Sequence, residues 1–168
     1  MDRTGKRERD AAFTAFVEQA TPSLLRTAWL LTGDHDAAHD LVQAALVRTY
    51  VAWPRVRPET ALAYSRRILV NQRTDRWRRH GPELAVAAPP EGATRPDGAT
   101  EDRHVVVRLL ATLPEQQRKV VVLRYYADLS EQATADALNI SVGSVKSAAS
   151  RGLATLRTQL ANSEGGVR

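Results

Sequence analysis

The sequence predicts an all-α protein made of two small helical domains joined by a flexible linker. Three observations lead to this prediction. The chain has 168 residues, enough for one domain or two small ones. Apolar residues recur at helical spacing in its first and last parts. Between them, residues 81–100 read GPELAVAAPPEGATRPDGAT, which is rich in proline and glycine and has no helical period. We therefore expect domains at about residues 10–80 and 101–162, with a linker at 81–100.

The composition excludes several classes of protein. There is no cysteine, which excludes disulfides, thiolate metal sites and thiol nucleophiles and makes a reducing cytoplasm the expected location. The segment MDRTGKRERD has no apolar core, so no signal peptide is expected, and no apolar run is long enough to span a membrane. The net charge of +5 is modest, but residues 66–79 contain six arginines and a single acid, Asp75. Such a cluster indicates a polyanionic partner.

Local signals define the first elements. Thr21-Pro22-Ser23 predicts the start of a helix, and Gly33 predicts its end. Asp34 or Asp36 is expected to cap the next helix. That helix has the clearest apolar period in the chain, and it should end at Trp53-Pro54, because a residue before proline is pushed out of helical geometry. Its predicted buried face consists of Ala38, Leu41, Val42, Ala45, Leu46, Thr49, Ala52 and Trp53.

A third helix is predicted from Glu59 to Arg79, and its arginine-rich part indicates nucleic-acid binding. A solvated, salt-bridged helix face is the alternative, but one acid cannot pair with six arginines. Arginines beside Trp77 and polar residues suit a surface that neutralises phosphates and stacks a base, although Trp77 suits a core position equally well. Asn71, Asp75 and Arg78 or Arg79 fall on one side of this helix. The packing residues are expected to be Ala63, Ile68, Leu69 and Val70.

The second domain should begin with a helix at about Val105–Leu113. Pro114 and Glu115 suit the first turn of the following helix. The run VVVLRYY (residues 120–126) has strand-like propensity, but it lies in a helical frame of apolar residues, so we predict a helix there.

The segment after Asp128 has the spacing of a helix-turn-helix. Ser130 can cap a helix from Glu131 to Leu138, Asn139 suits a left-handed turn position, and Ser141 can cap the second helix. Small Ala135 would lie where the helices cross, with Val145 and Leu153 facing inward. The alternative is an αα-hairpin packed only for stability.

The exposed face of the second helix favours DNA binding over a purely structural hairpin. Hydroxyls and amides near a helix N-terminus bind phosphates, and Lys and Arg reach phosphates or guanine edges. The small side chains of this helix would let it lie deep in the major groove. Because a helix with so few long side chains recognises only a short DNA site, a second DNA contact is expected at residues 66–80. The residues expected to face DNA are Ser144, Lys146, Ser147, Ser150 and Arg151.

Three segments in this order resemble the bacterial extracytoplasmic-function (ECF) sigma factors, in particular the small actinobacterial SigE-like subgroup. They are LLRTAWLLTGDHDAAHDLVQAALVRTYVAW (residues 24–53), RRILVNQRTDRWRR (66–79) and LATLPEQQRKVVVLRYYADLSEQATADALNISVGSVKSAASRGLATLR (110–157). The resemblance implies a region 2-like domain that binds the β′ clamp coiled-coil of core RNA polymerase and recognises and melts the −10 promoter element. It also implies a region 4-like domain that places its helix-turn-helix in the −35 element and packs on the β flap.

Residue by residue, the resemblance assigns functions to three sets of positions. Polymerase binding falls on Asp40, Leu41 and Gln43, with Val47 beside them. Recognition and melting at −10 fall on the loop 54–59 and on Asn71, Arg73, Asp75, Trp77, Arg78 and Arg79. The −35 readers are Lys146, Ser147, Ser150 and Arg151. The chain has His39 and Ala44 where the family commonly has acidic residues, and Ala148 where many relatives have a longer side chain, so one DNA contact is expected to be missing there.

In this family the polymerase supplies the catalysis and its metal ions. The resemblance therefore implies no catalytic residue, cofactor, metal site or small-molecule substrate in this chain. An anti-sigma factor is a partner that the sequence neither requires nor excludes.

Three other functions remain open. His35 and His39 are four residues apart, as in a metalloprotease helix, but the intervening acid is Asp36, and the remaining histidines, His80 and His104, lie near the linker. A conventional repressor or activator would use the same helix-turn-helix but needs a dimer interface or an effector pocket, and neither is evident. A sigma-like protein could also occupy polymerase without starting transcription.

Overall fold

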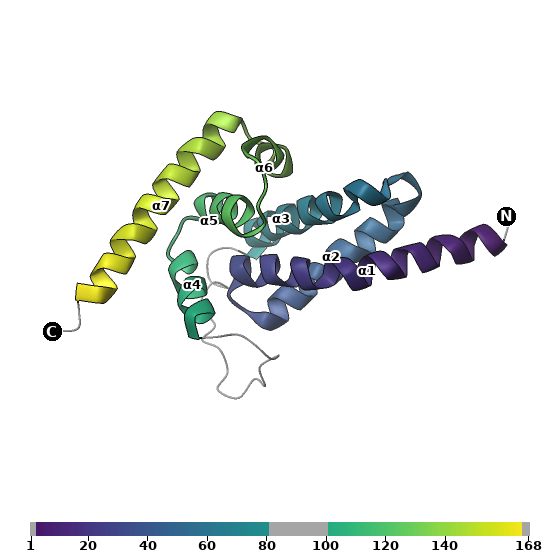
Figure 1. Cartoon of the computed structure of the whole chain (residues 1–168), viewed down its shortest axis with the longest axis horizontal. Helices are drawn as coiled ribbons and strands as arrows, with labels where there is room; N and C mark the ends of the chain where they lie inside the picture. The colour runs from purple at the N-terminus through teal and green to yellow at the C-terminus, as the bar shows by residue number, and fades with distance from the viewer. Residues whose placement is uncertain (1–2, 81–100, 166–168) are drawn as a thin grey trace.

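The computed structural model describes the backbone of residues 3–80 and 101–165, and the side chains of residues 3–72 and 101–163. Each regular element in these residues is helical, which confirms the predicted all-α class (Figure 1). The predicted linker, residues 81–100, lies outside the described part. The elements are α1 (Arg3–Thr32), α2 (His35–Ala52), η1 (Trp53–Arg55), η2 (Pro58–Thr60), α3 (Ala61–His80), α4 (Glu101–Ala111), α5 (Glu115–Val121), the π-helix η4 (Val122–Tyr126), α6 (Glu131–Leu138) and α7 (Val142–Gly165).

The first helix continues through Pro22, so the predicted start at Thr21-Pro22-Ser23 is wrong. A proline inside a helix removes one amide donor and costs about 3 kcal/mol. The ring of Pro22 is exposed, whereas Ala20 and Leu24 on either side of it are buried. The packing of both flanking residues against the rest of the bundle therefore keeps the helix continuous. Such tertiary packing cannot be predicted from a local sequence pattern.

The turn between α1 and α2 forms as predicted. Gly33 ends α1 with φ of +70°, and its amide donates to the carbonyl of Trp29 at 2.7 Å. A Cβ at this position would also lie 3.3 Å from Cγ1 of Val107 on α4, so the turn is a point of close approach. Asp34 caps α2, because its Oδ1 accepts the amide of Ala37 at 2.7 Å.

The predicted face of α2 is confirmed: each of its eight residues is buried or half-buried. The crossing with α3 contains a buried polar pair, since Thr49 Oγ1 and Ser65 Oγ lie 2.9 Å apart and both residues are 0% exposed. On α3, Leu69 and Val70 are buried as predicted. The packing prediction for Ala63 is wrong: Ala63 is exposed, and Ala61 is buried instead, because it lies in line with buried Ser65 and Leu69 at four-residue spacing.

In the C-terminal part, the strand-like run 120–126 is helical, as predicted, and forms the end of α5 and η4. The helix-turn-helix has the predicted caps. Ser130 Oγ accepts the amide of Ala133 at 3.0 Å, and Ser141 Oγ accepts the amide of Ser144 at 3.0 Å. Asn139 adopts φ 54° and ψ 48°, the left-handed conformation that the turn requires.

Small side chains on α7 serve packing. Ala148 and Ala149 are both only 9% exposed and pack with Val120, Ala135 and Val145. The interpretation of Ala148 as a missing DNA contact is therefore wrong, because position 148 faces the helix-turn-helix core. Gly152 is also buried, and a Cβ there would lie 2.9 Å from Cγ2 of Val121 on α5.

The N-terminal lobe (α1–α3) and the C-terminal lobe (α4–α7) share one apolar core. It joins Leu31, Leu69 and Val70 of the first lobe to Leu110 and Leu123 of the second, among others. Across the boundary between the lobes, α6 packs on α3, while η4 and α4 pack on α1, and in Figure 1 α7 forms an outer edge. The two sequence domains are thus packed against each other in this structure.

Arg118 on α5 ties the lobes together. Its guanidinium donates to carbonyls at and just after the C-terminal ends of α1 and α4, where the helix supplies few amide partners. On the C-terminal side it reaches Leu110 (2.9 Å), Ala111 (3.2 Å) and Leu113 (3.0 Å), and on the N-terminal side it reaches Leu31 (3.1 Å).

The close approach of α7 to α5 predicts opposite effects for the same change at two glycines of one helix. Gly152→Ala should destabilise the fold by about 1–2 kcal/mol, because the new methyl group overlaps Val121. Gly143→Ala should stabilise it by up to about 1 kcal/mol, because a Cβ there meets only Ser141 Oγ at 3.8 Å and alanine favours the helix. Urea unfolding measures both. A stabilised Gly152→Ala variant would contradict the packing of α7 on α5.

Two buried threonines predict a second matched pair. Thr134 is 0% exposed and its Oγ1 has no hydrogen-bond partner, so Thr134→Val should stabilise the fold by about 1 kcal/mol. Thr49→Val should destabilise it by about 1–3 kcal/mol, because Ser65 Oγ would be left buried without its partner. The free energies of unfolding of the two variants test this. Equal effects would show that the hydroxyl of Thr134 is satisfied.

Candidate nucleic-acid interface

The five residues predicted to face DNA on α7 are all exposed on that helix. We call the surface formed by Ser144, Lys146, Ser147, Ser150 and Arg151 the reading face. It lies opposite the side of α7 that carries Val145, Ala148, Ala149 and Gly152. The buried residues and the exposed residues therefore lie on different sides of one helix, and the reading face contributes no side chain to the apolar core.

Two residues of the reading face have partners within the chain. Ser144 Oγ lies 2.9 Å from Ser141 Oγ, next to the cap of α7. Lys146 Nζ lies 3.7 Å from Glu131 Oε2, and the side chains of Lys146 and Glu131 are 63% and 40% exposed. Glu131 is the first residue of α6, directly after the cap Ser130. Sequence reasoning missed Glu131, because the pairing depends on how α6 and α7 cross.

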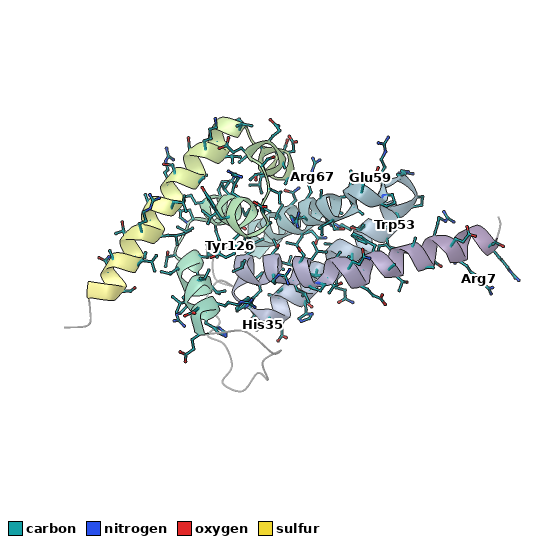
Figure 2. All side chains as sticks on the ribbon, in the orientation of Figure 1. Arg7, His35, Trp53, Glu59, Arg67 and Tyr126 are labelled. Carbon is teal, nitrogen blue, oxygen red and sulfur yellow. The ribbon has the colours of Figure 1, made fainter. Side chains whose placement is uncertain are left out.

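The arginine-rich part of α3 is helical to His80, as predicted, but most of its candidate side chains lie outside the described residues. These are Arg73, Asp75, Trp77, Arg78 and Arg79. Asn71, the remaining −10 candidate, is half-buried. Arg67 is exposed and labelled in Figure 2, whereas Arg66 is 9% exposed and reaches Ser23 Oγ on α1 at 3.4 Å. Burial lowers the pKa of Arg66.

An aromatic cluster that the sequence did not reveal joins α1 and the end of α2 to the start of the connector between α2 and α3. The ring of Phe13 lies 5.1 Å from that of Trp53 and 4.9 Å from that of Tyr50, and Phe16 lies 5.2 Å from Trp53. Tyr50 donates to Asp10 Oδ1 at 2.8 Å, and this hydrogen bond raises the pKa of Tyr50. The cluster fastens α1 to the start of the connector, and Figure 2 shows Trp53 and Glu59 at this end of the bundle.

The predicted polymerase-binding residues lie on α2, but on two sides of it. Asp40, Gln43 and Val47 are exposed, with Val47 58% exposed, whereas Leu41 is 5% exposed and packs in the core. Next to Gln43 and Val47 runs an apolar groove of about 600 Å³ between α1 and α2. The wall on α1 consists of Phe13, Val17, Thr21 and Leu25. These four residues are spaced by four, a helical signal that could have predicted the groove.

The two histidines of the metalloprotease alternative do not form a metal site with other residues of the described part. No group of three or more His, Asp or Glu side chains within it is placed to hold a metal ion. His35 stacks on Trp29 with ring centroids 5.0 Å apart, while His39 is exposed at the groove. In addition, none of the helices in residues 3–80 and 101–165 has the length and apolar character needed to cross a membrane.

Comparison with known families matches both halves of the chain. Residues 16–83 match sigma-70 region 2, and residues 103–156 match sigma-70 region 4. The RNA polymerase sigma-E factor of Streptomyces coelicolor is 41% identical over 153 residues, which cover 88% of this chain and 85% of that protein. The ECF RNA polymerase sigma factor SigW of Bacillus subtilis is 32% identical over 168 residues, covering 89% of both chains.

Two solved structures share the fold. One is the sigma factor RpoE from Bartonella quintana in complex with the anti-sigma factor NepR, with a TM-score of 0.74 and 24% identity over 88% of this chain and 96% of that chain. The other is CnrH in complex with the cytosolic domain of CnrY, with a TM-score of 0.68 and 22% identity over 91% and 90%. The two region matches and the identity to the sigma-E factor decide the family: this chain belongs to the ECF sigma factors of the sigma-70 family and is an alternative sigma factor of RNA polymerase.

Proposed function

We propose that this sigma factor joins core RNA polymerase to a promoter through two DNA contacts, one from each domain. The domain at residues 10–80 would recognise and melt the −10 element, the domain at 101–162 would read the −35 element, and the linker 81–100 would join them. The supporting observation is the reading face, whose five side chains are all exposed on a capped helix-turn-helix. The chain itself would perform no catalysis, hold no cofactor or metal, and act in the cytoplasm.

At the −35 element, we assign Ser144, Lys146, Ser147, Ser150 and Arg151 to DNA. The serines near the start of α7 suit phosphate contacts, whereas Lys146 and Arg151 can reach phosphates or guanine edges. Because α6 and α7 are locked by Asn139 and by the alanine core, the helix can enter the groove as a rigid body.

At the −10 element, we assign Asn71, Arg73, Asp75, Trp77, Arg78 and Arg79, together with the connector 54–59. The arginines would neutralise phosphates, and an aromatic ring would stack on an extruded base, which offsets the unstacking cost of a few kcal/mol. The aromatic cluster at Trp53 supports this role, because it fixes the connector to α1.

Polymerase binding is assigned to Asp40, Gln43 and Val47, with Leu41 supporting them from the core. The groove beside them offers apolar surface to a helix of the β′ clamp coiled-coil. The C-terminal lobe would pack on the β flap. An anti-sigma factor is a further proposed partner, since the sigma factor RpoE, which shares this fold, was solved in complex with the anti-sigma factor NepR.

The closed arrangement of the lobes cannot span a promoter. The −10 and −35 elements are separated by about 25 base pairs, or about 85 Å of duplex, whereas α3 and α6 are in contact. We propose that the lobes separate on polymerase, which replaces the contacts between them. Two weak DNA contacts fixed on one scaffold then gain from effective concentration.

Run-off transcription tests the proposed function. Purified core polymerase should start transcription from a subset of genomic promoters only when this chain is added. Stable binding of a duplex operator without polymerase would favour a conventional regulator. Binding to polymerase without transcripts from any promoter would favour a protein that occupies polymerase.

Arg151→Ala should weaken −35-dependent promoter binding by about 1–3 kcal/mol, because it removes a long cation from the reading face. Binding to core polymerase should not change. Arg157→Ala, six residues further on along the same helix and outside the reading face, is the matched control and should bind promoters as the parent does. Equal loss of core binding by Arg151→Ala would mean that α7 does not face DNA.

Val47→Asp should weaken binding to core polymerase by about 1–2 kcal/mol, because it places a charge at the edge of the apolar groove. Val51→Asp is the control: Val51 is 77% exposed on the same helix and does not line the groove. Fluorescence titration of core polymerase with the two variants measures the difference. Identical affinities would place the polymerase contact elsewhere.

A further inference from the structure

The ion pair between Lys146 and Glu131 distinguishes the two cations of the reading face. Lys146 Nζ lies 3.7 Å from Glu131 Oε2, whereas the described residues place no carboxylate within ion-pair distance of Arg151. Glu131 is the first residue of α6, where its negative charge is favourable near the positive end of the helix dipole. The carboxylate thus lies at the margin of the proposed DNA surface, beside one of the two cations of that surface.

This arrangement affects unrelated DNA and target DNA differently. On an unrelated duplex Lys146 binds mainly to phosphates, because the base-edge acceptors are not matched to its position, and a nearby carboxylate repels those phosphates while attracting the ammonium. A target site can also offer acceptors on a base edge, such as O6 and N7 of guanine. When Lys146 leaves Glu131 to bind DNA, the free energy of the lost ion pair is therefore compensated better at a target site than on unrelated DNA. A repulsive group that weakens the wrong complexes more than the right one increases specificity.

We propose that Glu131 is a specificity-determining residue of the −35 interface, which acts by holding Lys146 away from non-target phosphates. This inference rests on the proposed role of the reading face in DNA binding. Glu131 acts through Lys146, so it is a positioning residue rather than a direct reader of bases.

The first test compares Glu131→Gln with Asp136→Asn in the full-length chain. Asp136 is exposed on the same helix, and its Oδ1 accepts from Gln132 Nε2 at 2.9 Å, so its replacement removes the same charge away from Lys146. Fluorescence anisotropy measures binding to a 20-base-pair duplex of unrelated sequence from about 20 to 200 mM salt. Glu131→Gln should bind about 3–10-fold more tightly, and its log–log salt slope should steepen by about 0.9, one additional phosphate contact. Asp136→Asn should change neither.

Unchanged or weaker binding by Glu131→Gln overturns the proposal. An equal gain with Asp136→Asn also overturns it, because the effect would then reflect net charge alone.

A double-mutant cycle identifies the route of the effect. In a Lys146→Gln background, Glu131→Gln should alter the affinity less than about 2-fold, because the cation that Glu131 restrains is absent. A full gain in that background shows that Glu131 acts on DNA directly and overturns the positioning role.

The last measurement uses holoenzyme on a promoter that the chain transcribes and on the same promoter with a scrambled −35 element. Glu131→Gln should reduce the ratio of the two affinities by about 3-fold or more, and an unchanged ratio overturns the proposal. Failure of the parent chain to support transcription contradicts the proposed function instead. The duplex titrations need no polymerase, so the two failures are distinguishable.

Discussion

The guanidinium of Arg118 occupies the point at which two helices end, and the arrangement of the lobes depends on it. Carbonyl groups at helix C-termini have no amide partners within the helix. A guanidinium presents several donors in a fixed planar fork, so it can satisfy carbonyls of both α1 and α4 at once. Around this point the apolar residues of the two lobes form one core. One side chain therefore joins the ends of α1 and α4 beside the apolar core that the two lobes share.

Within the helix-turn-helix, the residues that pack and the residues proposed to contact DNA lie on different sides of α7. Alanines and a glycine bring α7 close to α5 and α6, and this close approach is possible only because the side chains are small. The long and polar side chains of α7 point the other way. The reading face can consequently change its chemistry without disturbing the core. Within the core, the buried hydroxyl of Thr134 without a partner marks a position where the fold is less stable than it could be.

The features that could be predicted from the sequence are those with a local cause. Asn139 was predictable because few residues tolerate a left-handed turn, and Asp34, Ser130 and Ser141 because capping depends on two or three neighbouring positions. Continuity of α1 through Pro22 was not predictable, because it results from packing on both sides of the proline. The inward orientation of Ala148 and the contact between the lobes were also missed, because both depend on packing between helices that are distant in the sequence. On the candidate site, the exposed residues of α7 followed from periodicity, whereas the partner of Lys146 required the crossing of two helices.

The shared core has a consequence for synthesis of the chain. The N-terminal lobe leaves the ribosome first, and its face around Leu31 and Leu69 is covered only when α4 to α6 have also emerged. At about 5–20 residues per second, the segment from the end of α3 to the end of α6 takes several seconds to translate. During that interval the nascent chain carries an uncovered apolar face while still tethered. Chaperones that bind nascent apolar segments would act at this stage, before residue 137 is available to complete the fold.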